Sequence, residues 1–443
     1  MKKIKFLSII ALLAVFITAC SSDDDSPAQD TCSDGIQNGD ETGVDCGGSC
    51  EPCEEGNEVT KSGILTEDEH WTADNIYLLD NKVVVDEGIT LTIDPGTIIK
   101  GKEGQETLLS ALVVARGGTL IAEGTADEPI IFTSELDDIQ PGQTQGTNLT
   151  VNDTGLWGGV LILGNAPISK GNDLEETQVE GLPADEDYGL FGGDDPDDSS
   201  GRLNYISIRH GGGSIEPDNE INGLSLAGVG SGTEISNIEV VGNRDDGVEW
   251  WGGTVNVTNA IVWGQGDDGF DTDEAWSGTF SNGAVIMTSN TNGSGLEMDG
   301  PNGSEATAAS HTLENITLIG AGGSNRYADF RDGLLAEINN VLAYGFNAES
   351  TVRINGDDSH TEYTDGRLTI SNWEIVLPDA VENPADIFIA VTINDNDEEE
   401  PIEGFDPSAF ANEVTPIDAA GDASVGADMS VFDWTFAKAQ GAY

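Results

Sequence analysis

The chain has 443 residues, and its 81 Asp and Glu against 17 Lys and Arg give a formal net charge of −64. A surface this acidic repels phosphate and sulfate at long range, which excludes nucleic acid as a partner and favours cations such as Ca²⁺. Hydrophobic residues make up 37 % of the chain and 57 residues are glycine, a composition typical of short strands joined by tight turns. The charge also keeps an extracellular protein soluble, so composition alone leaves the cation interpretation open.

Residues 1–19, MKKIKFLSIIALLAVFITA, combine a basic start, an apolar stretch and small residues ahead of Cys20. This pattern is typical of a secretory signal peptide and is too short for a resident membrane helix. The segment Ile17-Thr18-Ala19-Cys20 resembles a bacterial lipobox. The resemblance implies cleavage before Cys20 and lipidation of its thiol, for example with palmitate. An ordinary signal peptide followed by a chance cysteine is the alternative.

Residues 20–31 form an acidic tether that begins Cys20-Ser21-Ser22 and continues with three Asp. It resembles the surface-export signal of lipoproteins from Bacteroidota. The resemblance implies a lipid-anchored protein of the outer membrane that faces the extracellular side. A tether that is merely solvated is the alternative.

Residues 32–57 form a cysteine-rich module that holds Cys32, Cys46, Cys50 and Cys53. Four cysteines in a short extracytoplasmic segment with few apolar residues predict two disulfides of undetermined connectivity. A four-cysteine zinc site is the alternative, although the spacing departs from paired Cys-x-x-Cys motifs. The module resembles a short repeat of secreted proteins from the same bacterial group, which implies a spacer or a small binding module.

Residues 58–443 read as a long series of short strands, such as KVVVDEGITLTIDPGTIIKG and LWGGVLILGNAPIS. Apolar residues alternate within each piece, and equivalent pieces recur about every 20 to 30 residues. Strands repeating at this interval predict an all-β fold, a right-handed parallel β-helix, because each coil buries its inner face against the next. A β-sandwich is less favoured because two-residue hairpin turns are few. We expect acidic loop inserts at 186–201 and 394–404, and a C-terminal cap of the last coil formed by 432–443.

Three pieces of this series align closely: GVEWW at 247–251, GFDTD at 269–273 and GLEMD at 295–299. Because side chains alternate between the two faces of a strand, Glu249, Asp271 and Glu297 should all point outward, one above another. A second outward column follows two residues later in each strand. Asp-Asp pairs occupy the entrances of the first two strands.

Charges stacked in this way repel one another, by about 3 kcal/mol for two charges ~4.8 Å apart at an effective dielectric constant near 20. Protonation, basic partners or bound metal would relieve the repulsion, and a solvated acidic face is the remaining alternative. Arg331 and Arg353 fall in later coils and can pair with one end of the ladder. We favour Ca²⁺ for the rest. The predicted ligand group comprises Asp245, Asp246, Glu249, Asp267, Asp268, Asp271, Asp273, Glu297 and Asp299.

The stretch DDGFD at 267–271 resembles the calcium-ligand segment of certain β-helix pectate lyases. The resemblance implies that Asp267, Asp268 and Asp271 hold a Ca²⁺ that binds a uronate carboxylate. The Lys that acts as base in those enzymes has no counterpart here, because the chain has no Lys between Lys170 and Lys438. Longer stretches, among them LTIDPGTIIKG and DDGVEWWGGTVN, resemble an uncharacterised family of β-helix lipoproteins from Bacteroidota, which implies the fold and the surface location.

Tryptophans lie close to the acidic coils, and Trp251 and Trp276 are candidates for stacking on sugar rings. Core packing is the alternative for such residues. Together with Arg331 and Arg353 they form the predicted substrate-binding group. The four histidines are scattered and match no zinc-hydrolase motif.

These features predict a surface lipoprotein that binds extracellular polysaccharide with Ca²⁺, for adhesion or glycan capture. One alternative is a polysaccharide lyase or glycoside hydrolase that pairs Asp267 or Asp268 with Glu249 or Glu297. Another is a non-catalytic component of an outer-membrane uptake complex.

Overall fold

The computed structural model describes residue 32, residues 48–50 and residues 57–443 except 105, 185, 217–218, 302–309, 324 and 395–398. Contacts divide the chain into two units, Met1–Cys53 and Glu54–Tyr443. In the first unit a disulfide joins Cys32 and Cys50, which confirms a disulfide in the cysteine-rich module. The predicted signal peptide (1–19), Cys20, the tether (20–31), Cys46 and Cys53 lie outside the described residues.

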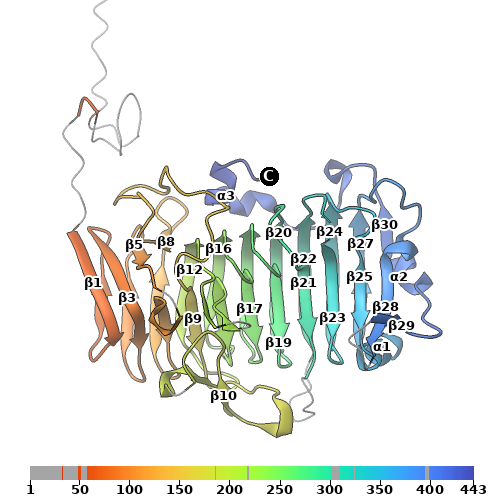
Figure 1. The fold of residues 1–443 in the computed structure, drawn as a ribbon, viewed down its shortest axis with the longest axis horizontal. Coiled ribbons are helices and arrows are strands. Elements are labelled where there is room, and N and C mark those ends of the chain that lie inside the picture. Colours follow the sequence, from red (N-terminus) through yellow and green to blue (C-terminus); the bar gives the residue numbers. More distant parts are fainter. Residues whose placement is uncertain are drawn as a thin grey trace, which may run out of the picture. The chain divides into compact units, whose positions relative to one another are not determined.

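The second unit is a parallel β-helix, as the sequence predicts (Figure 1). Successive coils pair in parallel across one 26-stranded assembly, and this pairing rules out a β-sandwich. One series of strands, which we call the site sheet, runs the length of the unit after β3 (Asn75–Val85). It consists of β6 (Ala111–Val114), β9 (Val160–Leu163), β15 (Leu224–Ala227), β17 (Val248–Trp251), β19 (Phe270–Asp273), β21 (Ser294–Asp299), β23 (Arg326–Arg331), β25 (Val352–Asn355) and β28 (Phe388–Ile393).

The rest of each coil is a bent strand or a pair of short strands. The bent strands are β12 (Gly201–Arg209), β16 (Glu234–Val241), β18 (Asn256–Trp263), β20 (Thr279–Ile286), β22 (His311–Ile319) and β24 (Ala336–Tyr344). At the N-terminal end lie β1 (Asn57–Ile64), β2 (Glu69–Trp71), β4 (Thr90–Ile93), β5 (Ile98–Gly101), β7 (Thr119–Glu123) and β8 (Ile130–Ser134). At the C-terminal end lie β26 (Leu368–Ser371), β27 (Trp373–Ile375) and β30 (Val414–Pro416).

Asparagines make the bends. Asn237, Asn259 and Asn282 have φ angles of 55°, 60° and 63°, a left-handed conformation that Asn tolerates better than most residues. Their side chains bond from coil to coil: Asn259 Nδ2 donates to Asn237 Oδ1 at 3.0 Å, and Asn282 Nδ2 donates to Asn259 Oδ1 at 2.9 Å. Half-buried amide groups therefore satisfy one another along the axis of the helix.

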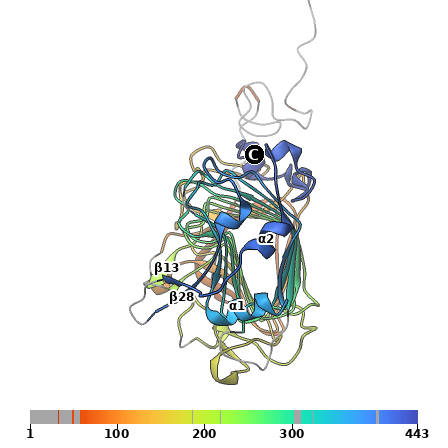
Figure 2. The ribbon, with the colours of Figure 1, turned by 90° about the vertical axis from the view of Figure 1, so that its right-hand side faces the viewer.

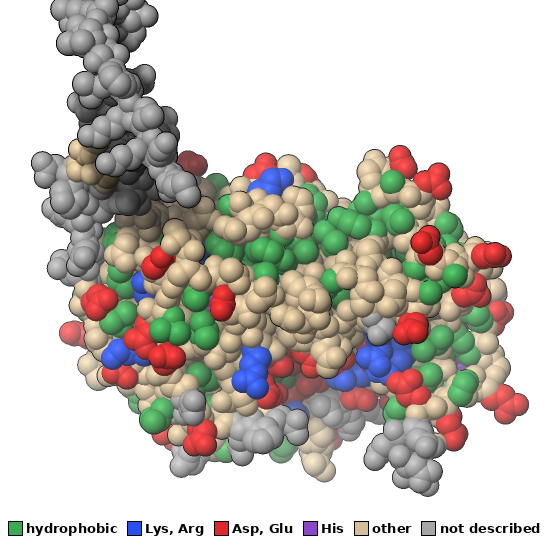
Figure 3. Space-filling view, turned by 45° about the horizontal axis from the view of Figure 1, so that its top comes forward, with side chains coloured by type: hydrophobic (Ala, Val, Ile, Leu, Met, Phe, Trp, Pro, Cys, Tyr) green, Lys and Arg blue, Asp and Glu red, His purple; other side chains and the backbone are tan. Residues whose placement is uncertain are grey.

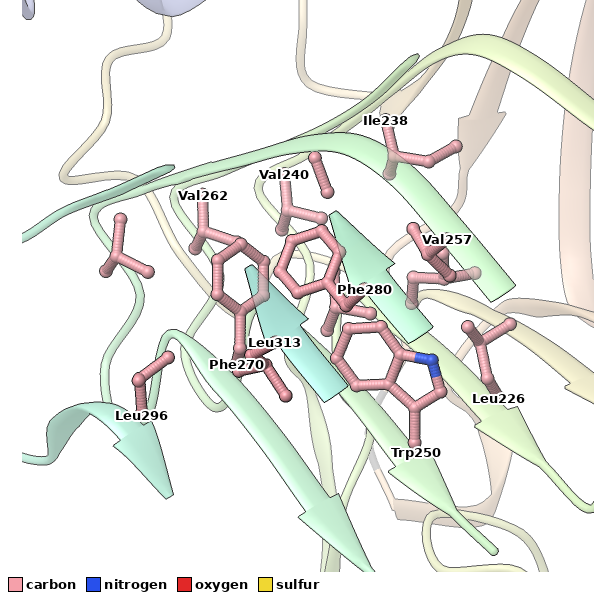
Figure 4. Packing of buried hydrophobic residues seen from close by; sticks show 14 of the residues in the cluster. Leu226, Ile238, Val240, Trp250, Val257, Val262, Phe270, Phe280, Leu296 and Leu313 are labelled. Atoms are coloured by element: carbon pink, nitrogen blue, oxygen red, sulfur yellow. The ribbon is translucent and has the colours of Figure 1, made fainter. Parts of the chain in front are cut away.

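The core fills the space between the site sheet and the bent strands (Figure 4). Phe270 packs edge-on against Phe280 with ring centroids 4.6 Å apart, and the Trp250 ring lies 5.6 Å from that of Phe280. Gly247 and Gly269 precede the site-sheet strands, where a Cβ would come within 2.4 Å of Val262 and 2.5 Å of Val285. Close packing therefore requires the glycine of each Asp-Asp-Gly unit.

Helices close the C-terminal end of the coil, where α1 (Asp357–Thr364) and α2 (Ser408–Glu413) lie across the end of the unit (Figure 2). Phe410 of α2 stacks on Phe388 at 4.2 Å and meets Trp373 edge-on. β29 (Glu399–Pro401) adds to β28 in the antiparallel direction.

The prediction that 432–443 caps the last coil is wrong. This segment, with α3 (Phe436–Ala439), returns along the outside of the bent strands and packs on Ile261 and Ile286 in the middle of the unit. On the way, the backbone N–H of Asp428 donates to Asn282 Oδ1, and that of Ala437 donates to a carboxylate oxygen of Glu239.

Two small antiparallel pairs decorate the coils. β10 (Thr177–Gln178) and β11 (Leu190–Phe191) belong to the long insert between β9 and β12, which extends below the strands in Figure 1. β13 (Ser214–Glu216) pairs with β14 (Asn219–Glu220). Within the described part of the chain, no helix has the length and apolar character needed to cross a bilayer.

Candidate metal site on the outer face

The predicted register of the acidic strands is confirmed. Glu249 pairs with Asp271 and Asp271 pairs with Glu297, while Val248, Phe270 and Leu296 on the opposite face are fully buried in the core. The outward column, which we call the ladder, continues into neighbouring coils. Its members are Ser225, Glu249, Asp271, Glu297, Asp329 and Arg353.

The ladder is far less exposed than an outer face suggests. Glu249 is 7 % exposed and Asp271 is 8 % exposed, although neither belongs to the core. The insert between β9 and β12 crosses this face: its Lys170 forms an ion pair with Glu274, and Ser169 Oγ donates to the backbone oxygen of Pro301 at 2.7 Å. Carboxylates on the outside of the coil thus sit in a partly desolvated environment.

Five of the nine predicted ligands come together in two overlapping groups. Asp246, Glu249 and Asp271 form a buried group, and Asp245, Asp246 and Asp267 form a more exposed one. In each group the available carboxylate oxygens lie within 4.8 Å of one another, and Asp246 belongs to both.

Hydrogen bonds fix the buried group. The backbone N–H of Asp268 donates to Asp246 Oδ1 at 2.8 Å, and Asn222 Nδ2 donates to Glu249. Asp271 Oδ1 is buried and, among the described residues, has no hydrogen-bond partner. A buried carboxylate oxygen without a donor is costly, so this atom is the natural point for a cation to bind.

Burial raises the pKa of Asp246, Glu249 and Asp271 well above the usual range, and neighbouring carboxylates add to the effect. Burial likewise raises the pKa of Asp245 and of Asp268 to about 7. Such carboxyls remain partly protonated near neutral pH unless a positive charge replaces the proton.

Burial also raises the pKa values of carboxyls in the second outward column and of Glu297 in the ladder. Burial and the adjacent Glu274 raise the pKa of Asp273 to about 6. Burial raises the pKa of Asp299 to about 7 and that of Glu297 to about 9, against the opposing effect of Arg331.

Arginines neutralise the C-terminal end of the ladder. Arg331 forms a bidentate pair with Asp299, with distances of 2.6 and 2.7 Å, and contacts Glu297 at 2.5 Å. Arg353 forms a bidentate pair with Asp329 and also contacts Glu399. These pairs confirm the expected basic partners, and Figure 3 shows Lys and Arg side chains among Asp and Glu along the lower part of the view.

Some of the predicted metal ligands are instead engaged in ion pairs or hydrogen bonds. Glu297 and Asp299 serve Arg331, while Asp268 Oδ1 accepts from the backbone N–H of Ser294. Asp273 and these three residues lie outside both metal-binding groups. Arg353, expected to contact substrate, is 7 % exposed and fully engaged with carboxylates, whereas the Arg331 side chain retains 34 % exposure.

The two tryptophans are not exposed platforms, which corrects the prediction for both. Trp276 is completely buried: it stacks on Trp250 at 5.1 Å, and its Nε1 donates to the backbone oxygen of Val255. Trp251 does point away from the core, but it is 5 % exposed because it packs with Ile168 of the insert in a second apolar cluster.

Sequence reasoning missed the residues that come from distant segments. Lys170 reaches the acidic coils from the insert, and Asn222 reaches Glu249 from the preceding coil. Glu274 adopts a φ of 54° next to Ala275 at 56°, an uncommon conformation for residues other than glycine. In the sequence, Lys170 stood out only as a single lysine within a long acidic stretch. Nothing in the sequence indicated where its side chain would lie.

A cavity of about 960 Å³ is lined by Arg244, the residue next to the more exposed carboxylates in the sequence. Leu109, Leu156 and Ile215 provide apolar walls. The charged lining residues are Arg244 and three acids, Glu103, Glu106 and Glu220. Arg244 immediately precedes Asp245, and the charge of Glu220 is, after burial, the largest influence on the Asp245 pKa.

Arg244 is distinctive within this acidic molecule. Of all the Lys and Arg side chains in the described part of the chain, it alone has neither an ion pair nor a hydrogen bond. Its guanidinium group therefore remains free for a ligand.

The buried group suits a hard cation. Ca²⁺ prefers six to eight oxygen ligands, a number that three carboxylates and water can supply, and Asp271 Oδ1 lacks any partner among the residues that the structure describes. The absence of Cys and His from both groups argues against zinc or copper at this position.

Comparison with known proteins places this geometry in context. No curated protein and no solved structure matches the chain. A family model described as a pectate-lyase-like beta helix domain matches residues 63–435. This range covers the ladder, both carboxylate groups and the adjoining cavity. The chain therefore belongs to the pectate-lyase-like β-helix family.

Proposed function

We propose that the protein is a surface lipoprotein that binds extracellular polysaccharide through Ca²⁺ held by Asp246, Glu249 and Asp271. The observation that carries this proposal is the buried carboxylate trio, in which Asp271 Oδ1 has no partner among the described residues. A cation there would relieve the cost of burying like charges. A β-helix fold of the pectate-lyase type supports a role connected with polysaccharide.

The glycan would occupy the cavity beside the exposed group of Asp245, Asp246 and Asp267. Its apolar walls suit the C–H faces of sugar rings, and its charged residues suit hydroxyl groups. Arg244, which has no ion pair or hydrogen bond within the described part of the chain, would bind an acidic substituent such as a carboxylate, for which a guanidinium offers paired donors. The Ca²⁺ would supply positive charge to sugar oxygens when bound.

The basic side chains near the acidic coils favour glycan binding without turnover over a lyase reaction. Lys170 is the lysine nearest the acidic coils in the described structure, and its ion pair with Glu274 raises its pKa against the effect of burial. A lysine held in its charged form is a poor general base. The lipid anchor and the outer-membrane location remain part of the proposal through the lipobox resemblance at Cys20.

Glycan binding with and without a chelator tests the function. The full-length protein should retain uronate-containing polysaccharide in excess Ca²⁺ and release it in the chelator. Asp271→Asn should weaken the Ca²⁺-dependent binding at least about tenfold, since it removes one ligand charge. Asp127→Asn, an exposed substitution remote in sequence from the ladder, is the matched control and should bind as the parent does.

The same glycans separate binding from catalysis. Unsaturated products absorbing in the ultraviolet would identify a lyase, and new reducing ends without that absorbance would identify a hydrolase. Either product would replace the binding proposal. Chelator-insensitive binding would keep the glycan and remove the metal.

A further inference from the structure

A second cavity, of about 610 Å³, lies at the C-terminal end of the coil, away from the two carboxylate groups along the chain. Its walls come from α1, β26 and the segment 404–413 that includes α2. Both helices lie at this end of the unit in Figure 2. The volume is that of sites for small organic molecules.

Aromatic rings form one side of this end cavity. His360 and Tyr363 stand three residues apart on α1 and therefore share one face of the helix. The His360 ring meets the edge of Phe405 at 5.7 Å, and Phe405 packs on Phe388 at 5.2 Å. Tyr363 also meets Phe388, at 5.4 Å, so the core fixes the positions of these rings.

Carboxylates form the other side. Asp406 and Glu413 line the cavity, and both are exposed. Burial raises the pKa of the Tyr363 phenol, and the charges of Asp406 and Glu413 add to the effect, which places both acids near its ring. Asp406 Oδ1 accepts from the backbone N–H of Ser408 at 3.0 Å, which fixes that carboxylate at the start of α2. The Glu413 carboxylate, at the end of α2, has no ion pair or hydrogen bond with any described residue.

No positive side chain balances these two acids: among the described residues that line the cavity there is no Lys or Arg. Arg367, the nearest arginine in sequence, pairs with Glu362 and Asp365. Aromatic rings combined with uncompensated carboxylates are the features that attract an organic cation.

We propose that the cavity bounded by His360, Tyr363, Phe405, Asp406 and Glu413 binds a small organic cation, an ammonium group carried on an apolar body. The rings contact the body and the ammonium group, and the carboxylates provide the opposite charge. This site is independent of Ca²⁺ and of the polysaccharide proposed above.

Calorimetric titration of the full-length protein with phenethylammonium tests the proposal, with 2-phenylethanol as the neutral probe of the same skeleton. The ammonium should bind at least about tenfold more tightly than the alcohol, and a Ca²⁺ chelator should leave its affinity unchanged. The double variant Asp406→Asn/Glu413→Gln should reduce its affinity at least about tenfold. The Asn side chain can still accept from Ser408, so α2 retains its first turn.

Asp379→Asn/Glu382→Gln is the matched control, because it removes two exposed carboxylates that do not line the cavity. Its affinity for phenethylammonium should stay within about twofold of the parent value, since the long-range field changes equally in both variants. Three results would overturn the proposal: no binding of the ammonium, equal binding of the alcohol, or equal loss in the two double variants.

Discussion

At the scale of single residues, Asp271 is the member of the buried carboxylate trio that has an unpaired oxygen among the described residues. It lies between Glu249 and Glu297 in register, it is buried, and its Oδ1 has no partner within the described structure. Asn243 and Asn222, by contrast, donate to the backbone or side chains around Asp246 and Glu249. The protein therefore fixes the positions of these carboxylate oxygens but leaves their negative charge uncompensated.

This arrangement predicts an unusual pH dependence of stability. Because burial raises the folded-state pKa of Asp245, Asp268 and Asp299 to about 7, the folded protein binds more protons than the unfolded chain between about pH 4 and pH 7. The stability that these protons contribute is present at low pH and is lost as the pH rises through 7. With a chelator present, the melting temperature should fall from about pH 5 to about pH 8. Excess Ca²⁺ should abolish most of that fall.

Melting curves at several pH values, with and without Ca²⁺, make the comparison. Asp271→Asn should show a weaker fall in the chelator, because one of the coupled carboxyls is gone. A melting temperature that rises with pH in the chelator would contradict the assignment of buried, uncompensated carboxyls.

The Arg353–Asp329 pair predicts a large effect of a single substitution. Asp329 is fully buried, so Arg353→Met leaves a charge without a partner and should cost about 3 to 5 kcal/mol of unfolding free energy. Asp329→Leu combined with Arg353→Met should restore most of that loss. Urea unfolding measures both variants. Arg367→Met, at an exposed pair, should cost less than about 1 kcal/mol, and equal losses at the two sites would refute this account.

Much of this residue-level arrangement follows from alternation along the strands. The outward positions of Glu249, Asp271 and Glu297 follow from aligning three short segments, and the structure confirms their register. Their burial does not follow, because the covering residues come from a distant insert, whose Lys170 lies 104 residues from its partner Glu274 in the sequence. The same insert explains why Trp251 points outward yet is not exposed.

At the scale of elements, the bent strands depend on their asparagines. Asn259 donates to Asn237 and accepts from Asn282, and its φ of 60° disfavours most other residues. The strand pattern in the sequence shows only alternation broken by an Asn, which also fits an ordinary turn. Elements with regular alternation were therefore predictable, while the bend within a single strand was not.

Asn259→Ala should lower the unfolding free energy by about 1 to 2 kcal/mol, since it breaks two hydrogen bonds between half-buried amides and places Ala in a left-handed conformation. Asn412→Ala, on the exposed side of α2, should change it by less than about 0.5 kcal/mol. Chemical denaturation compares the two variants. Equal and small effects would show that the asparagine ladder contributes little.

At the scale of the whole molecule, the C-terminal segment ties distant coils together. Phe432 and Ala437 pack on Ile261 and Ile286, and the Phe436 ring lies 4.6 Å from the Arg209 guanidinium carbon. The apolar residues of the C-terminal segment indicated that this segment would cover another surface of the protein. It did not indicate which surface, because the end of a coil and its side wall present similar apolar residues.

Phe436→Ala should therefore destabilise the whole coil, by about 3 to 5 kcal/mol, because it opens a cavity above a buried arginine. Lys438→Ala, two residues away and exposed, should cost less than about 0.5 kcal/mol. Thermal unfolding distinguishes them. A local loosening of the segment, with the main transition unchanged, would show that it only lies on the coil.

The most direct test of the central claim is a Ca²⁺ titration of thermal stability at about pH 8, above the pKa of Asp245, Asp268 and Asp299. The parent protein should gain several degrees with saturating Ca²⁺. Asp271→Asn should melt higher than the parent in the chelator, because it removes one of several crowded, buried carboxyls, and should gain little from Ca²⁺. A parent that does not respond to Ca²⁺, or an Asp271→Asn variant that responds as the parent does, would contradict the account.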